Sequence, residues 1–184
     1  TVFRLGYFLP YAIPGVVAAM MWMYLYSPQL SPLASVIPIN FFDKNIILAS
    51  MANMTTWTFT GYNMLVFLAA LKAIPTDLYE AARLDGCSGF QVAMKIKVPM
   101  LTNAALLTVL LSIIGTIQLF NEPTVMRAGQ SWMGNSYTPM MMAYSTMMTS
   151  PGNPNMASAI SMTMAIIAAL LAAVYAFVQT WGKR

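Results

Sequence analysis

Half of the charged side chains of this chain lie in one short stretch, residues 72–99. The sequence has nine basic and five acidic residues in 184. Seven of these fourteen fall within the stretch: Lys72, Asp77, Glu80, Arg83, Asp85, Lys95 and Lys97. Mixed charges of this kind can form charge-assisted hydrogen bonds with a partner. Each would cost about 3 kcal/mol in hydrocarbon, so the stretch must contact water or protein.

The residue types exclude several kinds of active site. The sequence contains no His and a single Cys, Cys87. A His-assisted triad, a Cys/His zinc site and an internal disulfide are therefore excluded. The sequence also lacks a G-x-x-x-x-G-K-[ST] loop, because Gly182-Lys183 has neither the preceding glycine nor the following hydroxyl. We expect no catalytic residue, metal site or cofactor in this chain.

The remainder of the chain has the composition of a membrane protein. Apolar residues make up 59% of the sequence and charged residues 8%, whereas soluble domains carry about 25% charge. About 20 helical residues cross a bilayer core of about 30 Å. Four uncharged segments reach this length, and we predict them to be spans: 7–26, 46–71, 101–120 and 156–181. We therefore expect an all-α polytopic helix bundle in a lipid bilayer, with residues 1–184 as one transmembrane domain.

The basic residues predict how these spans are oriented. With both ends of the chain in the cytoplasm, the inner segments hold seven of the nine: Arg4, Lys72, Arg83, Lys95, Lys97, Lys183 and Arg184. The outer loops then hold only Lys44 and Arg127. This bias follows the positive-inside rule and makes 72–99 a cytoplasmic loop. Because the basic residues are scattered between apolar spans, we expect no nucleic-acid partner.

The local sequence of the loop predicts two short helices. Pro75 suits the first turn of one helix, and Asp85-Gly86 suits a turn that ends it. Ser88 and Gln91 then have the spacing of a capping box at the start of a second helix. The two short helices and their turn would form a compact knob between two spans. This knob could simply connect the spans, for which two or three residues would suffice. Its capped, charged and partly apolar character favours a docking surface.

The loop resembles the EAA loop of binding-protein-dependent ABC importer permeases. That pattern is EAA, three residues, G, nine residues, then I-x-L-P. Here it reads Glu80-Ala81-Ala82, then Gly86, then Ile96-Lys97-Val98-Pro99, with the spacing intact. Asp85 fits the commoner extended form, whereas Val98 replaces the usual Leu and Cys87 stands where Ala is frequent.

The resemblance extends over essentially the whole chain. Trp57, Gly61 and residues 71–75 are placed as in sugar-importing permeases of the maltose type, and residues 120–123 and 137–139 are similar to a carbohydrate-permease subset. The resemblance implies the MetI-like core of a type I ABC importer. Such permeases have six core spans, so we expect the first two to lie upstream of residue 1.

In that family the EAA loop couples the permease to an ATP-binding subunit. The resemblance implies polar contact by Glu80, close approach at Ala81 and Ala82, a turn at Asp85 and Gly86, and anchoring by Ile96 and Pro99. It also implies a second permease subunit, two ATP-binding subunits that hold ATP and Mg²⁺, and an extracytoplasmic solute-binding protein. The implied location is the inner or plasma membrane of a bacterial or archaeal cell.

Polar residues within the spans are candidates for a solute pathway. Buried amides and hydroxyls need partners, which are either other helices or a hydrated cavity. The candidates are Tyr62, Asn63, Gln118, Asn121 and Glu122. Threonines of the second span and Ser112 and Thr116 of the third raise the same question. Alternatively, these polar residues make contacts between helices. For Asn121 and Glu122, the alternative is an interfacial turn before Pro123.

Three other functions compete with a sugar importer. The chain could serve an ABC importer for another solute, such as a polyol phosphate. It could also be a four-span structural or signalling protein whose knob docks another partner. A secondary transporter would need a carboxylate or His within the membrane to couple protons, and none lies in the four predicted spans.

Overall fold

The computed structural model describes residues 2–32, 36–37 and 39–181, and within these residues every regular element is a helix. The helices are α1 (Val2–Ala12), α2 (Gly15–Tyr26), α3 (Ile47–Lys72), α4 (Thr76–Leu84), α5 (Gly89–Val92), the π-helix η1 (Ala93–Lys97), α6 (Val98–Ile117), α7 (Asn121–Arg127), α8 (Pro139–Met148) and α9 (Pro154–Trp181). The all-α prediction is confirmed.

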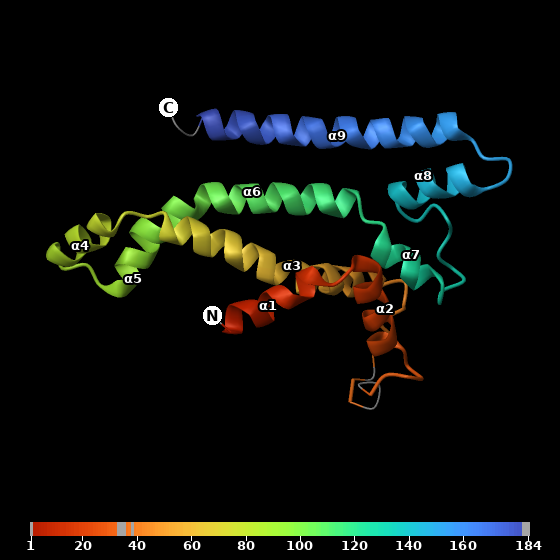
Figure 1. Ribbon diagram of the computed structural model, residues 1–184, viewed down its shortest axis with the longest axis horizontal. Coiled ribbons are helices and arrows are strands. Elements are labelled where there is room, and N and C mark those ends of the chain that lie inside the picture. Colours follow the sequence, from red (N-terminus) through yellow and green to blue (C-terminus); the bar gives the residue numbers. More distant parts are fainter. Residues whose placement is uncertain (1, 33–35, 38, 182–184) are drawn as a thin grey trace.

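The three long helices α3, α6 and α9 run along the longest axis of the molecule (Figure 1), with α6 in contact with both others. Most of the short helices gather at the two ends, whereas α1 lies along α3. At one end α4 and α5 project beyond the long helices, and at the other lie α2, α7 and α8. The C-terminal end of α9 points toward the end that carries α4 and α5. The predicted loop 72–99 and the predicted outer loops therefore lie at opposite ends.

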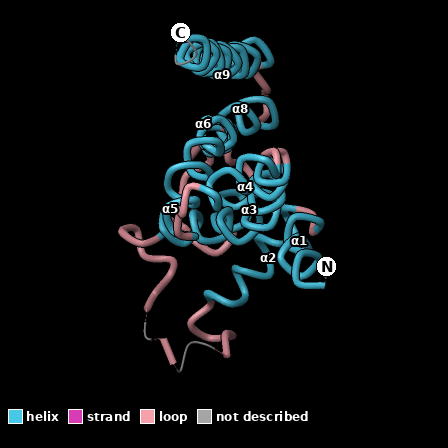
Figure 2. The backbone as a smooth tube through the Cα atoms, turned by 90° about the vertical axis from the view of Figure 1, so that its left-hand side faces the viewer, coloured by secondary structure: helices cyan, strands magenta, loops and turns pink. Residues whose placement is uncertain are grey.

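Two helical segments are long and apolar enough to cross a membrane, the 39 residues Gly89–Arg127 and the 27 residues Pro154–Thr180. Up to four crossings result if each of two bent helix pairs counts as one. The second of these segments corresponds to the predicted span 156–181. Figure 2 shows α9 at one edge of the molecule, beyond α6 and α8. Most of its side chains are exposed, which leaves them for lipid or another helix.

The span predicted at 7–26 is not one continuous helix. Two helices replace it, because α1 begins at Val2 and meets α2 at an angle of 96°. Pro14 lies at the bend and has no N–H for a continuous helix, and a proline also disfavours the helical conformation of the preceding residue. At 11 and 12 residues, each helix is about 17 Å long and too short to cross alone.

The second span was predicted within one residue, as 46–71 against the observed α3, Ile47–Lys72. Its axis bends by 65° into α4. Gly61 is the point where α3 meets α1 most closely. A Cβ atom built there would overlap the Tyr7 carbonyl group. Only a residue without a side chain allows the two backbones to approach so closely.

The third span also differs from its prediction as a helix over 101–120. The helix begins at Gly89, continues through η1 into α6 and ends at Ile117. The second helix of the loop is therefore an extension of the span. Pro99 does not interrupt this helix, because the π-turn before it preserves continuity, with the Val98 N–H bonded to the Ala93 carbonyl five residues back.

The buried apolar core lies at the end of the molecule that carries the predicted outer loops. Its members come from α2, α3, α7 and the loops: Tyr26, Phe42, Ile47, Met51, Met54, Met126 and Met133. The Tyr26 hydroxyl donates to the Ser50 carbonyl (3.2 Å) and accepts from the Asn53 amide (2.8 Å). Lys44 lies 5.6 Å from the centre of the Trp132 ring, which links the two outer loops. The core therefore fixes the outer loops against the long helices.

Candidate functional site

The end of α4 has the turn that the sequence predicts at Asp85-Gly86. Gly86 has φ +73°, in the left-handed region that favours glycine. Its N–H donates to the Arg83 carbonyl (3.1 Å), and the Cys87 N–H donates to the Ala82 carbonyl (2.9 Å). This pair of bonds is a Schellman motif, which satisfies carbonyls left free at a helix end. Pro75 lies one position earlier than predicted, at the N-cap of α4.

The start of α5 is the predicted capping box. The Ser88 hydroxyl accepts from the Gln91 N–H (3.3 Å), and the Gln91 side-chain oxygen accepts from the Ser88 N–H (2.7 Å). Two backbone N–H groups at the helix start are thereby satisfied by short local contacts. The ends of α4 and α5 that face each other are therefore both fixed, and residues 76–97 form a defined helical knob.

The exposed face of the knob carries the acidic residue and one alanine of the motif. Glu80 and Ala81 are exposed. Large apolar side chains lie near them in sequence, with Leu84 exposed to 89% and Phe90 to 73%. Ala82 is exposed to only 6% and packs within this chain, so close approach to a partner remains a prediction for Ala81. A carboxylate beside uncovered apolar groups is suited to binding another protein.

The remaining motif residues connect the knob to α6. Ile96 is half-buried within η1, whereas Pro99 is exposed in the first turn of α6. Asp85 is exposed beside Gly86 in the turn. Helix continues from Gly89 to Ile117, so the second helix of the knob and the long helix α6 form one continuous element.

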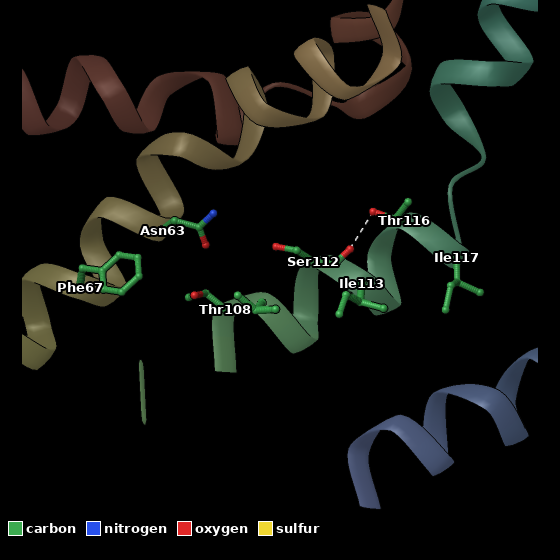
Figure 3. Close-up of a pocket in the computed structure, with 8 residues that line it drawn as sticks. Asn63, Phe67, Thr108, Ser112, Ile113, Thr116 and Ile117 are labelled. Atoms are coloured by element: carbon green, nitrogen blue, oxygen red, sulfur yellow. Dashed lines mark hydrogen bonds between the residues drawn. The ribbon is translucent and has the colours of Figure 1, made fainter. Parts of the chain in front are cut away.

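A pocket of about 400 Å³ lies between α3 and α6. Its lining residues are Asn63, Phe67, Thr108, Val109, Ser112, Ile113, Thr116 and Ile117, all uncharged. Figure 3 shows the Asn63 amide of α3 and the Ser112 hydroxyl of α6 directed into the space between the helices. The Thr116 hydroxyl donates to the Ser112 carbonyl (2.8 Å). Amide and hydroxyl groups beside an aromatic ring can bind an uncharged polyhydroxylated solute.

Of the predicted pathway residues, the structure places Asn63 in this pocket. The Tyr62 ring instead stacks on Tyr11 of α1, with centroids 5.1 Å apart. Gln118 is the exposed C-cap of α6 and does not line the pocket. Asn121 and Glu122 begin α7, and a Cβ on Gly15 would lie 2.7 Å from the Asn121 amide nitrogen. The Tyr62 and Asn121 contacts are therefore with other helices.

The α6 side of the pocket could have been predicted more completely. Thr108, Ser112 and Thr116 are spaced four residues apart, so they lie on one face of a helix. Thr108 is the member of this hydroxyl stripe that sequence reasoning missed. Apolar lining residues such as Phe67 give no such signal, because apolar side chains occur on every face of these helices.

Comparison with known proteins gives one matching family over nearly the whole chain. The family model described as "Binding-protein-dependent transport system inner membrane component" matches residues 1–183. The lactose transport system permease protein LacF of Rhizobium radiobacter is 34% identical over 144 residues, covering 78% of this chain and 46% of LacF. The maltose/maltodextrin transport system permease protein MalF of Salmonella typhimurium is 35% identical over 107 residues, covering 54% of this chain and 21% of MalF.

The fold also matches a solved structure. A bacterial ABC transporter involved in the import of the acidic polysaccharide alginate superposes with a TM-score of 0.74 at 18% identity, covering 96% of this chain and 64% of that one. At this identity the likeness shows the fold alone. The chain spans less than half the length of LacF and MalF.

Proposed function

Because the chain belongs to the family of binding-protein-dependent transport system inner membrane components, we propose that it is the permease part of an ATP-driven sugar importer. The observation that carries this proposal is the knob. Its motif spacing is intact, both facing helix ends are capped, and its exposed face combines Glu80 with Leu84 and Phe90. Such a surface is built to receive a partner and to transmit its movement to α6.

The proposal assigns ATP hydrolysis to separate subunits. Two ATP-binding subunits would bind ATP and Mg²⁺ and contact the knobs of this permease and of a second permease subunit. An extracytoplasmic solute-binding protein would deliver the sugar at the opposite end, where the outer core fixes the loops. This arrangement places the knob and both ends of the chain in the cytoplasm, which the distribution of Lys and Arg supports.

The pocket between α3 and α6 is the proposed part of the solute pathway in this chain. Asn63, Ser112 and Thr116 would offer hydrogen bonds to sugar hydroxyls, and Phe67 an apolar surface. The lining residues carry no charge, which favours an uncharged sugar over a polyol phosphate. The relatives named for lactose and maltose transport support the same solute class.

Capture of the ATP-binding subunit tests this function directly. The permease is immobilised in detergent and its partner ATPase is added. Glu80→Gln is expected to lower capture by at least about tenfold, since it removes a charge from a protein contact. Asp43→Asn is the matched control, because it makes the same carboxylate-to-amide change at the predicted outer end. Equal capture by all three proteins would contradict the proposed docking.

Transport is tested with the complete complex in proteoliposomes. Labelled sugar is supplied with the solute-binding protein, and ATP is enclosed or added on the side of the ATPase. Uptake that depends on ATP, and is reduced by Asn63→Leu without loss of ATPase capture, is the expected result. Uptake unaffected by Asn63→Leu would exclude the pocket from the pathway while leaving the docking result intact.

A further inference from the structure

The two arms of the knob are attached to the long helices in different ways. Its second arm, α5 and η1, continues directly into α6. Its first arm, α4, is joined to α3 across a 65° bend and to α5 through the turn at residues 85–88. A helix of nine residues that is joined to its neighbours through turns takes its orientation from the side chains that pack along it. The direction in which Glu80 points therefore depends on what holds α4.

A side-chain contact between Lys97 and Tyr79 joins the two arms. The ammonium group of Lys97, the last residue of η1, lies 5.5 Å from the centre of the Tyr79 ring on α4. This distance is within the range of a cation–π interaction. Both side chains are half-buried, so the contact is partly shielded from water.

The contact lies on a different face of α4 from the motif carboxylate. Tyr79 and the buried Ala82 are three residues apart and form the inner face of the helix, whereas the exposed Glu80 and Leu84 are four apart and form the outer face. Holding the Tyr79 ring against Lys97 consequently directs Glu80 outward, toward solvent and the place of a partner.

We propose that Lys97 and Tyr79 form a brace that positions α4 for coupling to the ATP-binding subunit. Neither is a binding residue here: both act through the orientation of Glu80 and Leu84. The inference rests on the proposed function, because the brace matters only if the knob docks an ATPase. Breaking it weakens the link between ATP hydrolysis and transport, so more ATP is used for each sugar molecule imported.

A double-mutant cycle in the reconstituted complex tests the brace. Lys97→Met and Tyr79→Leu are each expected to lower sugar transported per ATP hydrolysed by about two- to fivefold, the range for a partly exposed cation–π contact. The double variant is expected to transport as much sugar per ATP as the more impaired single variant, because both changes remove the same interaction. Lys97→Arg and Tyr79→Phe, which keep the cation and the ring, should retain the wild-type ratio.

Lys95→Met is the matched control, since Lys95 is an exposed lysine of the same π-turn. The Lys95→Met variant should transport the same amount of sugar per ATP hydrolysed as the wild type. If Lys97 instead contacted the ATPase directly, Tyr79→Leu would leave the ratio unchanged. If the two residues acted independently, the losses of Lys97→Met and Tyr79→Leu would add in the double variant. Either result would overturn the brace.

A distance measurement keeps the inference testable where a variant assembles poorly. Spin labels are attached to cysteines replacing the exposed Ala81 of α4 and the exposed Met94 of η1, in a Cys87→Ser background of the full permease. Tyr79→Leu and Lys97→Met are expected to broaden or shift the distance distribution, and Tyr79→Phe and Lys97→Arg to leave it unchanged. Identical distributions in all variants would refute the brace.

The two proposals fail in different ways. A wild-type complex that neither captures the ATPase nor couples hydrolysis to uptake would refute the proposed function and, with it, the coupling role of the brace. A coupled wild-type complex whose ratio is indifferent to Tyr79→Leu and Lys97→Met would refute the brace alone.

Discussion

Gly86 shows how a single residue determines the shape of the knob. Its positive φ turns the chain out of α4, so that the N–H groups of Gly86 and Cys87 donate hydrogen bonds to two carbonyls in the last turn of the helix. A Cβ atom at Gly86 would meet nothing within 4 Å. The requirement for glycine is therefore conformational and does not arise from packing, which makes the position suitable for a clean substitution.

We expect Gly86→Ala to weaken coupling. Alanine in the left-handed region costs about 1 to 2 kcal/mol, so the turn would shift toward other conformations and displace α4. The measurement is sugar uptake per ATP hydrolysed, which should fall severalfold. Gly89→Ala is the control, because a Cβ there also meets nothing within 4 Å and its φ is not positive. Equal ratios for the two variants would show that the turn geometry is unimportant.

At the scale of the elements, prolines and glycines decide where these helices bend and meet. Pro14 separates α1 from α2, whereas Pro99 lies inside a continuous helix. The sequence alone does not distinguish the two cases, because the outcome depends on whether a π-turn can absorb the missing N–H. At Gly61 the absence of a side chain instead allows α1 to lie directly against α3.

We expect Gly61→Ala to separate α1 from α3. The added methyl group would overlap the Tyr7 backbone, and overpacking of this kind costs about 1 to 3 kcal/mol. The measurement is thermal stability of the purified permease in detergent. Gly115→Ala makes the same change in α6 at a position with nothing within 4 Å. A loss of stability limited to Gly61→Ala confirms the close approach, and equal stability contradicts it.

At the scale of the whole molecule, the polar knob and the packed outer core lie at opposite ends of the long helices (Figure 1). Charge is concentrated at one end and aromatic packing at the other. The two ends of the molecule therefore differ. Under the proposed function, the excess of Lys and Arg on the knob side places the knob in the cytoplasm and the packed core at the opposite side of the bilayer.

The single native cysteine allows this direction to be tested. Cys87 lies in the knob and is half-buried. After removal of the ATPase, a membrane-impermeant maleimide is expected to label Cys87 in inside-out vesicles and not in right-side-out ones. Ser136→Cys in a Cys87→Ser background, at an exposed site between α7 and α8, should give the reverse pattern. The opposite results would invert the proposed topology.

The sequence by itself determined the helical class, the extent of α3 and α9, the knob and its caps. These features depend on local interactions or on the length of uncharged segments, which can be read residue by residue. Only the tertiary structure decided the bend at Pro14, the π-turn before Pro99, the approach at Gly61 and the partners of the polar span residues. It brought Asn63 into a pocket with Ser112 and Thr116 and placed Tyr62 against Tyr11. In a chain that is apolar on nearly every helix face, periodicity does not say which face meets which neighbour, so that information arises only when the helices pack.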